Sequence, residues 1–566
     1  MRYASAMSTK MQVSDYIAQF LAEMNTPAVY QLSGGMIAFI ADAIFEYGRT
    51  PIINLKHEQA AGFAAEGATR VTSRPSVALG TSGPGATNLI TAIASSFFDS
   101  VPVVYITGQV STAEIKKNRF QRQNGFQELN ICELTAGITK YSKRVDSSEE
   151  VPSVLRKAWE IAQSDRPGPV LIDIPIDIQQ QFLDEKLEIP PIPLVIKTNR
   201  INDNINLESL FKKSRKPMIL VGGGVRASDT VSQLRSLVSD TGIPAVASLM
   251  GIDALDWTNP LSIGFIGSYG NRWANKALAD SDTLLVLGSR LDSRQTGNSA
   301  EMFVKDKKII RIDIDDAELN GRITSDDTRQ LNLCNFFEVV QANYANENVD
   351  FTQEIHNWKQ EFSAPSEQIS TMEMNPNIVM SWINKFTTSA RGYVVDVGQH
   401  QMWAAQSIRT SPNQRFLTSG GLGAMGFSLP AAIGCASTLG GEWVVVIGDG
   451  CLQLSIAELQ TIATLNLEVT ICLINNNQHG MVAQFQEENM DSRFVGTRIG
   501  YNTPNFQEIS AAFRVPSISI SSENELESME IFLDKTVKGP RLIEFVISQK
   551  ALALPKLGRY ASLKDL

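Results

Sequence analysis

The chain has 566 residues and a formal net charge of −10 at pH 7. Hydrophobic residues make up 43% and charged residues 19% of it, which is typical of a compact globular protein, and the length predicts three or four domains. The negative charge and the lack of any basic run argue against a nucleic-acid partner. No stretch approaches the roughly 18 apolar residues of a membrane helix, so no membrane association is expected.

Short apolar runs alternate with amphipathic helical stretches along the chain, which predicts an α/β fold with doubly wound parallel sheets. Two regions that interrupt this pattern, 189–203 and 343–365, are rich in polar residues or proline and have the composition of linkers. We therefore predict three α/β domains, over residues 1–190, 191–360 and 361–566. The strand-like runs, in chain order, are 76–80, 101–108, 169–175, 217–224, 282–289, 308–315, 443–450 and 469–476.

The N-terminus and the cysteines bear on localisation. Residues 1–12 lack the apolar core of a signal peptide. The five cysteines are scattered and none has CxxC spacing. We therefore expect reduced thiols in a cytoplasmic protein.

In the first predicted domain, Glu58 opens a helix in the segment KHEQAAGFAAEGATR, whose following residues are mostly small and apolar. This composition predicts a buried face and a poorly solvated carboxyl that can hold a proton. A glutamate that merely stabilises the helix N-terminus is the alternative. The segment TSGPGATN (81–88) follows a strand and opens a helix, and by itself it also fits a generic anion-binding turn.

In the second predicted domain, polar residues and glycines follow two strands. Gly222, Gly223 and Gly224 end the run PMILVGGG, and Asp313 and Asp315 end KIIRIDID, where an acid can accept from ribose hydroxyls. These features would suit a nicotinamide-dependent dehydrogenase, which is a second functional class to weigh. A dehydrogenase, however, needs neither Glu58 nor the pattern that follows in the third domain.

The third domain contains a strand–helix–strand unit over 443–476. Its first strand ends in Gly448-Asp449-Gly450, and its second ends in Asn475-Asn476. A right-handed crossover brings both strand ends to one edge of the sheet, where ligands of open α/β sheets bind. Carboxylate and amide oxygens suit Mg²⁺ or Ca²⁺, and Mg²⁺ often completes its shell with phosphate oxygens. Taken alone, GDG is most often an ordinary turn, but the combination predicts a metal and diphosphate site.

This segment resembles the thiamine diphosphate motif, and nearly the whole chain resembles the acetohydroxyacid (acetolactate) synthase family. The resemblance implies that Asp449, Asn476 and the backbone carbonyl of Gln478 hold Mg²⁺. Cys451 stands where the family usually has Ser or Ala. The residues implied to contact thiamine diphosphate are Val397, Gly398, Gln399, His400, Gly423, Met425, Gly448, Gly450, Cys451, Gly480 and Met481.

The resemblance makes the first domain a pyrimidine-binding domain, in which Glu58 hydrogen-bonds N1′ of the cofactor pyrimidine. Met425 matches the apolar residue that bends the cofactor, although such a methionine is otherwise most often core packing. Three further residues implied to be catalytic or close to the reacting centre are Gly35, Gln127 and Lys140, with Phe126 in the substrate pocket; simple exposed polar residues are the alternative. The segment LSGGM departs from the YPGG usual in the family.

For the central domain, the resemblance implies a Rossmann-like fold that holds FAD with a largely structural role. The family's GDV segment is replaced near 331–337. The implied FAD contacts are Arg166, Gly222, Gly223, Gly224, Leu249, Met250, Gly267, Arg290, Asp313 and Asp315.

The expected reaction is decarboxylation of pyruvate followed by transfer of the two-carbon unit to an acceptor carbonyl. Decarboxylases of this class use a His-His pair that the chain lacks, which favours carboligation. Arg294 matches the arginine that meets the acceptor carboxylate. Ser268 and Phe485 stand where the family has Met and Trp, so the pocket should be roomier and suit a larger ketone, such as a nucleotide-linked keto-deoxysugar. An ordinary acetolactate synthase that condenses two pyruvates is the alternative.

Two further expectations concern assembly and the C-terminus. In the family, the counterparts of Glu58 and the metal motif meet across a subunit interface, which implies a homodimer or homotetramer. Segment 551–566 either closes over the site as a lid or is a frayed tail. A non-catalytic relative would be expected to lose Glu58 or Asp449, and both are present.

Overall fold

The computed structural model describes residues 10–118, 120–183, 189, 205–368, 374–533, 538–558 and 563. The chain forms two compact units. The first unit comprises Met1–Ile196, Ser419–Gly441 and Ser455–Glu468, and the second comprises Lys197–Thr418, Glu442–Leu454 and Val469–Leu566. The boundary predicted at 190 and most of the linker predicted at 189–203 lie outside the described residues.

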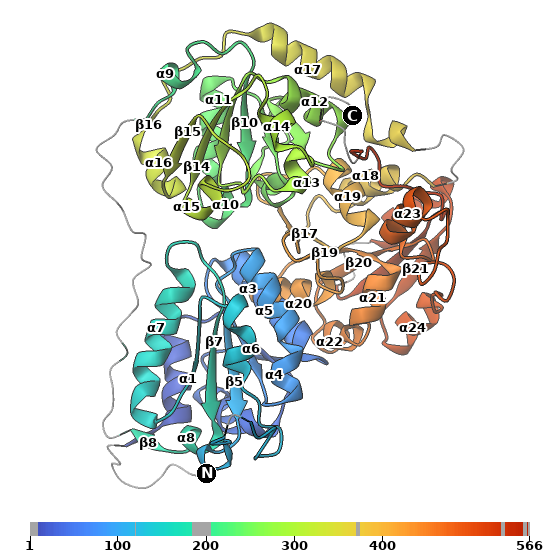
Figure 1. Cartoon of the computed structure of the whole chain (residues 1–566). Helices are drawn as coiled ribbons and strands as arrows, with labels where there is room; N and C mark the ends of the chain where they lie inside the picture. Colours follow the sequence, from blue (N-terminus) through green and yellow to red (C-terminus); the bar gives the residue numbers. More distant parts are fainter. Residues whose placement is uncertain are drawn as a thin grey trace. The chain divides into compact units, whose positions relative to one another are not determined.

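The first unit is built on a six-stranded parallel sheet in the order β3-β2-β4-β5-β7-β6 (Figure 1). Helices α1, α2 and α7 share a buried apolar cluster with alternate strand residues such as Val77 and Val104, whereas α3 packs on the opposite face against Tyr105. The strands are β2 (Val29–Gln31), β3 (Ile52–Asn54), β4 (Val77–Gly80), β5 (Val104–Gln109), β6 (Tyr141–Arg144) and β7 (Val170–Pro175), with a small antiparallel pair, β1 (Met11–Gln12) and β8 (Phe182–Leu183). The helices are α1 (Val13–Glu23), α2 (Ala38–Tyr47), α3 (Glu58–Thr72), α4 (Pro84–Asn88), α5 (Ile90–Phe98), α6 (Ile131–Thr135), α7 (Val151–Gln163) and α8 (Ile176–Gln179).

Two helices from late in the sequence, α20 (Ser428–Leu439) and α22 (Glu458–Thr464), also belong to the first unit. Helices α3 and α20 pack so closely that their backbones touch. A Cβ atom on Gly434 would lie 1.9 Å from the Ala64 carbonyl oxygen, and one on Gly67 would lie 2.2 Å from that of Ala431. Only glycine allows this approach, so the position of α20 depends on these two residues.

The second unit contains a central six-stranded parallel sheet in the order β12-β11-β10-β13-β14-β15. Numbered within the sheet, this order is 3-2-1-4-5-6, the order of dinucleotide-binding folds. The strands are β10 (Pro217–Val221), β11 (Ala245–Ala247), β12 (Ser262–Phe265), β13 (Thr283–Leu287), β14 (Lys308–Asp313) and β15 (Asp327–Gln330), with a small parallel pair, β9 (Ile205–Asn206) and β16 (Val340–Gln341). The helices are α9 (Leu207–Phe211), α10 (Gly223–Ala227), α11 (Val231–Thr241), α12 (Arg272–Asp280), α13 (Ser293–Thr296), α14 (Ala300–Val304), α15 (Asp316–Leu319), α16 (Leu333–Val339) and α17 (Val349–Glu361).

The second unit also contains a C-terminal parallel sheet in the order β18-β17-β19-β20-β22-β21. Its strands are joined to those of the central sheet region by a buried contact in which Asp253 accepts from Arg415 and from the Phe416 amide. The strands are β17 (Gly392–Val395), β18 (Arg415–Thr418), β19 (Trp443–Gly448), β20 (Val469–Asn475), β21 (Ser517–Ile520) and β22 (Arg541–Val546). The helices of the unit from this part of the chain are α18 (Pro376–Phe386), α19 (Gln399–Ser407), α21 (Asp449–Ser455), α23 (Gly480–Asn489), α24 (Phe506–Ala512) and α25 (Ser528–Phe532).

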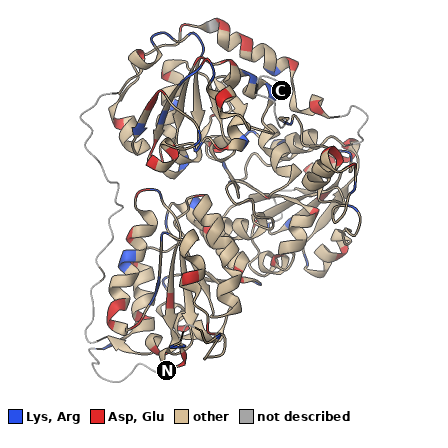
Figure 2. Cartoon of the chain, viewed as in Figure 1, with Lys and Arg blue, Asp and Glu red and all other residues tan. Residues whose placement is uncertain are grey.

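The predicted fold class is confirmed, because the chain forms three α/β domains with parallel sheets, and each strand-like run contains a strand. One prediction is wrong. Much of the polar stretch 343–365 is the helix α17 rather than a linker, since Phe351 and Ile355 lie one turn apart and are both buried. All five cysteines are free thiols. Among the described residues no helix is long and apolar enough to cross a membrane, and acidic and basic residues are interspersed along the helices (Figure 2).

The α3–α20 contact gives a first prediction. Gly434→Ala should lower the free energy of unfolding by about 1–3 kcal/mol, because the new methyl group would overlap the Ala64 carbonyl and force the helices apart. Gly137→Ala is the matched control, since a Cβ there meets nothing within 4 Å. The midpoints of denaturant unfolding are measured for the wild type and for both variants. Equal midpoints for Gly434→Ala and the wild type would contradict this account of the packing.

Candidate functional site

Three adjacent strands of the C-terminal sheet, β17, β19 and β20, end at one edge. The strand order reverses between β17 and β19, and ligands of open parallel sheets bind at such a point. Gly448 pairs with Ile474, so Asp449 comes level with Asn475 and Asn476 follows one residue later. The sequence-predicted metal residues therefore lie at the edge where the crossover was expected to bring them.

Asp449 begins helix α21 directly after β19 and is 3% exposed. Its Oδ1 accepts a hydrogen bond from the Gly450 amide at 3.0 Å, whereas Oδ2 has no hydrogen-bond partner among the described residues. Burial raises the pKa of this carboxyl to about 6, although the Gly450 amide, the nearby Tyr501 hydroxyl and the Gln478 backbone each lower it in part. An unpaired, buried carboxylate oxygen fits a cation.

Asn476 and Gln478 offer oxygens beside Asp449. The Asn476 side-chain amide donates to Gln399 Oε1 at 3.1 Å, which leaves its Oδ1 without a partner in the described part of the chain. Both polar atoms of the Gln478 side chain already make hydrogen bonds. The nitrogen donates to the Gln549 carbonyl at 2.8 Å, and the oxygen accepts from Arg498 at 2.6 Å. Only the backbone of Gln478 is left for a ligand, as the sequence resemblance implies. This donor set fits Mg²⁺.

His400 provides a neutral donor at the same edge. Its imidazole lies between Gly398 and Gly448, where a Cβ on either glycine would come within 2.7 or 2.8 Å of the ring. Burial lowers the pKa of His400 to about 4, with the nearby Asp396 raising it in part. The buried Nε2 has no hydrogen-bond partner among the described residues. A neutral ring with a free nitrogen fits a hydrogen bond to an anionic ligand such as a diphosphate.

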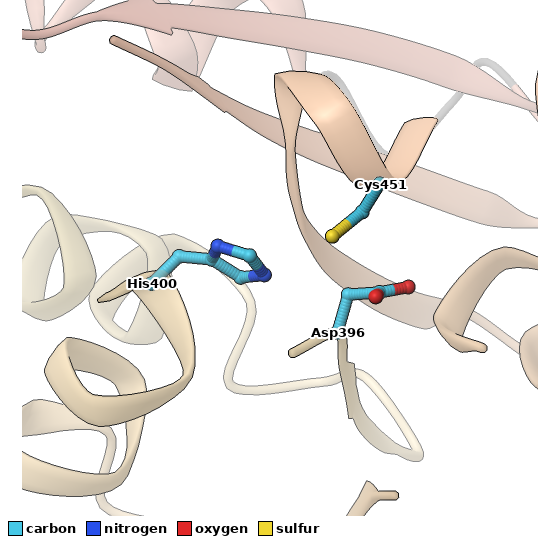
Figure 3. Close-up of side chains that lie close together, drawn as sticks. All are labelled: Asp396, His400 and Cys451. Atoms are coloured by element: carbon cyan, nitrogen blue, oxygen red, sulfur yellow. The ribbon is translucent and has the colours of Figure 1, made fainter. Parts of the chain in front are cut away.

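Cys451, Asp396 and His400 form a buried cluster whose ligand atoms lie within 4.8 Å of one another. Figure 3 shows the imidazole of His400 turned toward the other two side chains. The Cys451 thiol donates to the Val397 carbonyl at 3.2 Å. These residue types could hold a metal ion, but His400 and Cys451 are also part of the predicted diphosphate cradle, so no second cation is assigned.

The remaining residues of the predicted cradle divide between the two units. Gln399 begins α19, and Gly480 and Met481 begin α23, so these residues border the same sheet edge as Asp449. Gly423 and Met425 lie in the segment Ser419–Gly441 of the first unit. The preceding turn of that segment is held by Asp99, which accepts from the Gly421 and Gly420 amides at 2.7 and 3.0 Å.

In the first unit, Glu58 is the first residue of α3 and is 6% exposed, which confirms the predicted buried position at the start of a helix. Asn88, the last residue of α4, donates to Glu58 Oε2 at 2.9 Å. A Cβ on Gly85 would lie 3.2 Å from Oε1, so the turn 81–88 covers the other oxygen closely. Asn88 therefore fixes the orientation of the carboxyl group.

Gly35 and Gln127 lie against the same turn. The amide next to Gly35, that of Met36, donates to Thr81 Oγ1 at 3.3 Å. A Cβ on Gly83 would lie 2.9 Å from the Gln127 Cβ. The structure thus brings the loops that carry Gly35, Glu58 and Gln127 together around residues 81–88. Phe126 is 79% exposed.

Lys140 and Arg166 have other surroundings within the first unit. The Lys140 ammonium donates to the carbonyls of Ile161 and Ser164 at 2.5 and 2.6 Å, at the C-terminal end of α7. Burial lowers the pKa of Lys140 to about 8, with Asp165 raising it in part. Arg166 donates to Ser100 Oγ at 2.9 Å. The contacts of Lys140 are those of a helix C-terminal cap, and its catalytic role stays a prediction.

The predicted FAD residues of the central sheet lie at its C-terminal edge. Gly222 and Gly224 are required by packing, because a Cβ on them would lie 1.9 Å from the Gly288 carbonyl oxygen and 2.8 Å from the Gly288 Cα. Asp313 accepts from the Asp315 amide, and Asp315 in turn caps α15. A Cβ on Gly223 would meet Met250, and Gly267 has a φ of 115°. The Arg290 guanidinium lies 3.6 Å from the Asp292 carboxylate. The other members of the predicted FAD set are Gly223, Leu249, Met250, Gly267 and Arg290.

One buried cation at this edge was missed by the sequence analysis. Arg311 is 1% exposed, and its Nε and Nη1 have no hydrogen-bond partner among the described residues. Unpaired buried donors fit an anionic group, so the central sheet offers a feature that suits the phosphates of FAD even though its glycines and acids have local partners.

The predicted acceptor residues belong to the second unit. The Arg294 carbonyl accepts from the Ser268 amide at 2.7 Å and from the Ser268 hydroxyl at 3.2 Å. The guanidinium of Arg294 is exposed and has no hydrogen bond or ion pair within the described ranges. Phe485 lies on α23 and is 49% exposed. The structure therefore joins Ser268 and Arg294 directly.

The C-terminal segment contacts the turn that carries Ser268 and the helix that carries Phe485. The Leu557 amide donates to the Ser268 carbonyl at 2.9 Å, and Lys556 pairs with Glu488, which lies one helical turn after Phe485. Tyr269 connects these groups: burial raises the pKa of its hydroxyl, Lys556 and Arg294 lower it in part, and Glu488 raises it. Residues 559–562 and 564–566 lie outside the described residues, so the predicted lid stays a prediction.

Sequence reasoning did not assign roles to Asn88, Tyr501 or Lys556. Asn88 belongs to the motif TSGPGATN (81–88), but its contact with Glu58 spans 30 positions. Tyr501 and Lys556 lie in segments without a regular pattern, and no sequence signal connects them with Asp449 or Arg294. These contacts join residues that are far apart in the sequence, so they become visible only once the strands are arranged in their sheets.

Comparison with known proteins identifies the family. Three family profiles match: "Thiamine pyrophosphate enzyme, N-terminal TPP binding domain" over 11–134, the "central domain" over 206–330 and the "C-terminal TPP binding domain" over 396–545. The chain is 35% identical to acetolactate synthase 2, chloroplastic, of Nicotiana tabacum (98% of the chain, 84% of the relative). It is 33% identical to the acetolactate synthase large subunit of Corynebacterium glutamicum (100% and 91%) and to the isozyme 2 large subunit of Escherichia coli K12 (98% and 99%). The chain therefore belongs to the family of thiamine diphosphate-dependent, acetolactate synthase-like enzymes.

Proposed function

We propose that the chain is a carboligase that decarboxylates pyruvate and transfers the two-carbon unit to a ketone larger than a 2-keto acid, such as a nucleotide-linked keto-deoxysugar. The observation that carries this proposal is the acceptor region around Arg294. Its guanidinium has no hydrogen bond or ion pair among the described residues. Ser268, which bonds the Arg294 carbonyl, and Phe485 on α23 are smaller than the Met and Trp of the resembling family. A pocket with less side-chain volume admits a bulkier acceptor.

The cofactor is held at the edge of the C-terminal sheet in this proposal. Asp449, Asn476 and the Gln478 carbonyl would hold Mg²⁺, and His400 would contribute its free Nε2 to the diphosphate site. When bound, thiamine diphosphate supplies the chemistry that releases CO₂ from a 2-keto acid and passes the remaining acyl group to a carbonyl. Val397, Gly398, Gln399, Gly448, Gly450, Cys451, Gly480, Met481, Gly423 and Met425 complete the proposed cofactor contacts.

The protein's contribution to proton handling is proposed to rest on Glu58. Asn88 holds one carboxyl oxygen at 2.9 Å, and Glu58 so oriented would exchange a proton with the pyrimidine of the bound cofactor. Gly35 and Gln127, whose loops meet the turn 81–88, border the reacting centre and exclude water from it. Lys140 is proposed to border the reacting centre and Phe126 the substrate pocket, and the Lys140 ammonium also donates to two carbonyls at the end of α7.

The acceptor region holds two cations and one acid, and the acid pairs with one of the cations. Arg294 and Lys556 are cations that act on Tyr269, and Glu488 is the acid that acts on it with them. A simple 2-keto acid brings one carboxylate, which Arg294 alone can receive. Lys556 is already paired with Glu488, so Arg294 is the cation that an anionic group of the acceptor would meet.

An ordinary acetolactate synthase that condenses two pyruvates is the second candidate. This candidate is supported by the relatives described above, which are named acetolactate synthases and match nearly the whole chain. The two candidates share the cofactor and the first half of the reaction, so they differ only at the acceptor.

Three further parts of the proposal concern organisation. The domains are proposed to span 1–190, 191–360 and 361–566, consistent with profile matches that fall within these limits. FAD is proposed as a structural cofactor of the central domain, supported by the nucleotide-binding strand order. We also propose a homodimer or homotetramer, as the resemblance to the family implies.

The role of Glu58 gives a prediction for two variants. Glu58→Gln should lower kcat by a factor of about 10²–10⁴, because the amide cannot exchange a proton with the cofactor. Asn88→Ala should give a smaller loss, since it removes only the hydrogen bond that orients the carboxyl. Neither should weaken thiamine diphosphate binding greatly. Turnover, measured as CO₂ release from pyruvate, and cofactor affinity are compared with those of Glu46→Gln on the surface of α2. Undiminished turnover in Glu58→Gln would refute the activation role.

The unpaired carboxylate of Asp449 predicts a stability that depends on pH in the metal-free protein. Its pKa rises from 3.8 to about 6 on folding, so the ionised group costs roughly 3 kcal/mol above pH 6 and almost nothing below about pH 3, where it is protonated in both states. Asp449→Asn should therefore raise the free energy of unfolding by about 2–3 kcal/mol at pH 7.5 but hardly at about pH 3, where the wild-type carboxyl is uncharged in both states.

The measurement is unfolding of protein stripped of Mg²⁺ and cofactor, at both pH values. Asp491→Asn, whose side chain is 92% exposed, is the control and should change nothing. Addition of Mg²⁺ with thiamine diphosphate should stabilise the wild type and not Asp449→Asn. A variant that is less stable than the wild type without metal at pH 7.5 would contradict the assignment.

The acceptor is tested by identifying products. Pyruvate is supplied as donor with pyruvate, 2-ketobutyrate, a bulky neutral ketone or a nucleotide-linked keto-deoxysugar as acceptor, and products are analysed by mass spectrometry. We expect products from the larger ketones. The double variant Ser268→Met with Phe485→Trp should shift the product ratio toward acetolactate by about 10–200-fold, because it refills the pocket. Fast acetolactate formation without any product from bulky ketones would favour the second candidate instead.

A further inference from the structure

An arginine lies in the middle of an apolar strand of the central sheet. Arg311 on β14 is 1% exposed and is flanked by Ile310 and Ile312, which are also buried. Strands buried on both faces of a sheet are normally apolar throughout, and a buried charge is rarely found without a partner. Burying the charge of Arg311 therefore costs free energy of folding, and the fold alone does not explain why an arginine is kept there.

The hydrogen bonds of Arg311 leave much of its guanidinium unused. Nη2 donates to the carbonyls of Ser289 and Arg290 at 3.3 and 3.4 Å, which are long bonds. Nε and Nη1 are buried and have no partner among the described residues. Burial lowers the pKa of the guanidinium, and Asp313 and Glu318 raise it in part, but arginine stays charged in proteins.

The guanidinium lies toward the edge of the sheet where ligands bind. Arg311 pairs with Val286 in the register of β13 and β14, yet its hydrogen bonds reach Ser289 and Arg290, which lie three and four positions further along the chain. The side chain therefore runs toward the C-terminal ends of the strands. At the same edge the strand order reverses between β10 and β13, as in dinucleotide-binding folds.

The acidic side chains at this edge have other partners. Asp315 caps α15, and Asp292 accepts from the Arg294 and Gln295 amides at the start of α13. Asp313 accepts from the Asp315 amide at 3.0 Å. The planar fork of a guanidinium matches the oxygens of a phosphate, which would satisfy the unpaired donors and their charge together.

We propose that Arg311 binds an anionic oxygen of a nucleotide phosphate at the C-terminal edge of the central sheet. The inference extends the proposed FAD site and rests on it for the choice of probe. It adds a fully buried arginine to a site whose two arginines implied by the sequence have local partners, Arg166 with Ser100 and Arg290 with Asp292.

The experiment compares nucleotide binding and ligand-free stability in three proteins. Arg311→Met removes the donors and keeps much of the side-chain length, and Arg329→Met on the neighbouring strand β15, where Arg329 pairs with Asp327 at 2.9 Å, is the matched control. Proteins freed of bound ligands are titrated with FAD and with riboflavin, which has no phosphate, and flavin fluorescence reports binding. Thermal unfolding is followed without any ligand.

We expect Arg311→Met to raise the Kd for FAD by about tenfold or more and to leave the Kd for riboflavin nearly unchanged, since one charge-assisted contact is lost. Its ligand-free melting temperature should equal or exceed that of the wild type, because a buried unpaired charge has been removed. Arg329→Met should resemble the wild type in each assay.

Three results would overturn the inference. FAD affinity of Arg311→Met equal to that of the wild type would do so, as would an equal loss for FAD and riboflavin, which indicates a structural role. The third is a wild-type protein that binds FAD no more tightly than riboflavin. Pyruvate-dependent carboligation is measured on the same wild-type samples, so that failure of the nucleotide site is distinguished from failure of the proposed reaction.

Discussion

The carboxylate of Asp449 lies in the interior at the end of β19 with one oxygen unpaired, and the surrounding groups are arranged as if for a cation. The register of β19 and β20 places Asn476 at the same edge, and the hydrogen bond from Asn476 to Gln399 leaves its carbonyl oxygen available. Burial alone raises the pKa of Asp449, so the folded metal-free chain carries a free-energy cost that a divalent ion would remove. A diphosphate would then meet both the ion and the neutral imidazole of His400. In this arrangement metal and cofactor depend on each other.

Much of this edge could be predicted from the sequence, because it depends on short-range patterns. Apolar runs of strand length gave the positions of β19 and β20, and the rule for crossovers brought Asp449 and Asn476 together. The start of α3 at Glu58 follows from the same kind of local pattern. The hydrogen bond from Asn88 to Glu58 could not be predicted, since it depends on how α4 and α3 pack. The helix α17 was missed because its buried residues, Phe351 and Ile355, are few among many polar ones.

The proposed cofactor site and the proposed acceptor site are built on different kinds of element. Most of the proposed cofactor residues lie at or just after the ends of strands β17, β19 and β20, whose positions are set by the hydrogen bonds of the sheet. Ser268, Arg294 and Lys556 lie on a turn, on the short helix α13 and on the C-terminal segment, which are joined by single backbone hydrogen bonds. Side chains at such positions can change size or charge without moving a strand. Family membership therefore determines the cofactor much more strongly than the acceptor.

Two buried aspartates of the second unit show how a ligand site differs from a structural one. Asp253 and Asp449 are 2% and 3% exposed, so burial opposes the charge of both. Arg226, Arg415 and the Phe416 amide all act on Asp253, and although burial raises its pKa, these partners bring it below its ordinary value. Asp449 has no cation beside it among the described residues, and its pKa is raised. The same contrast, with the charge reversed, applies to Arg311. Buried groups that the fold leaves unpaired indicate where a ligand of opposite charge belongs, and the sign of the group indicates which ligand.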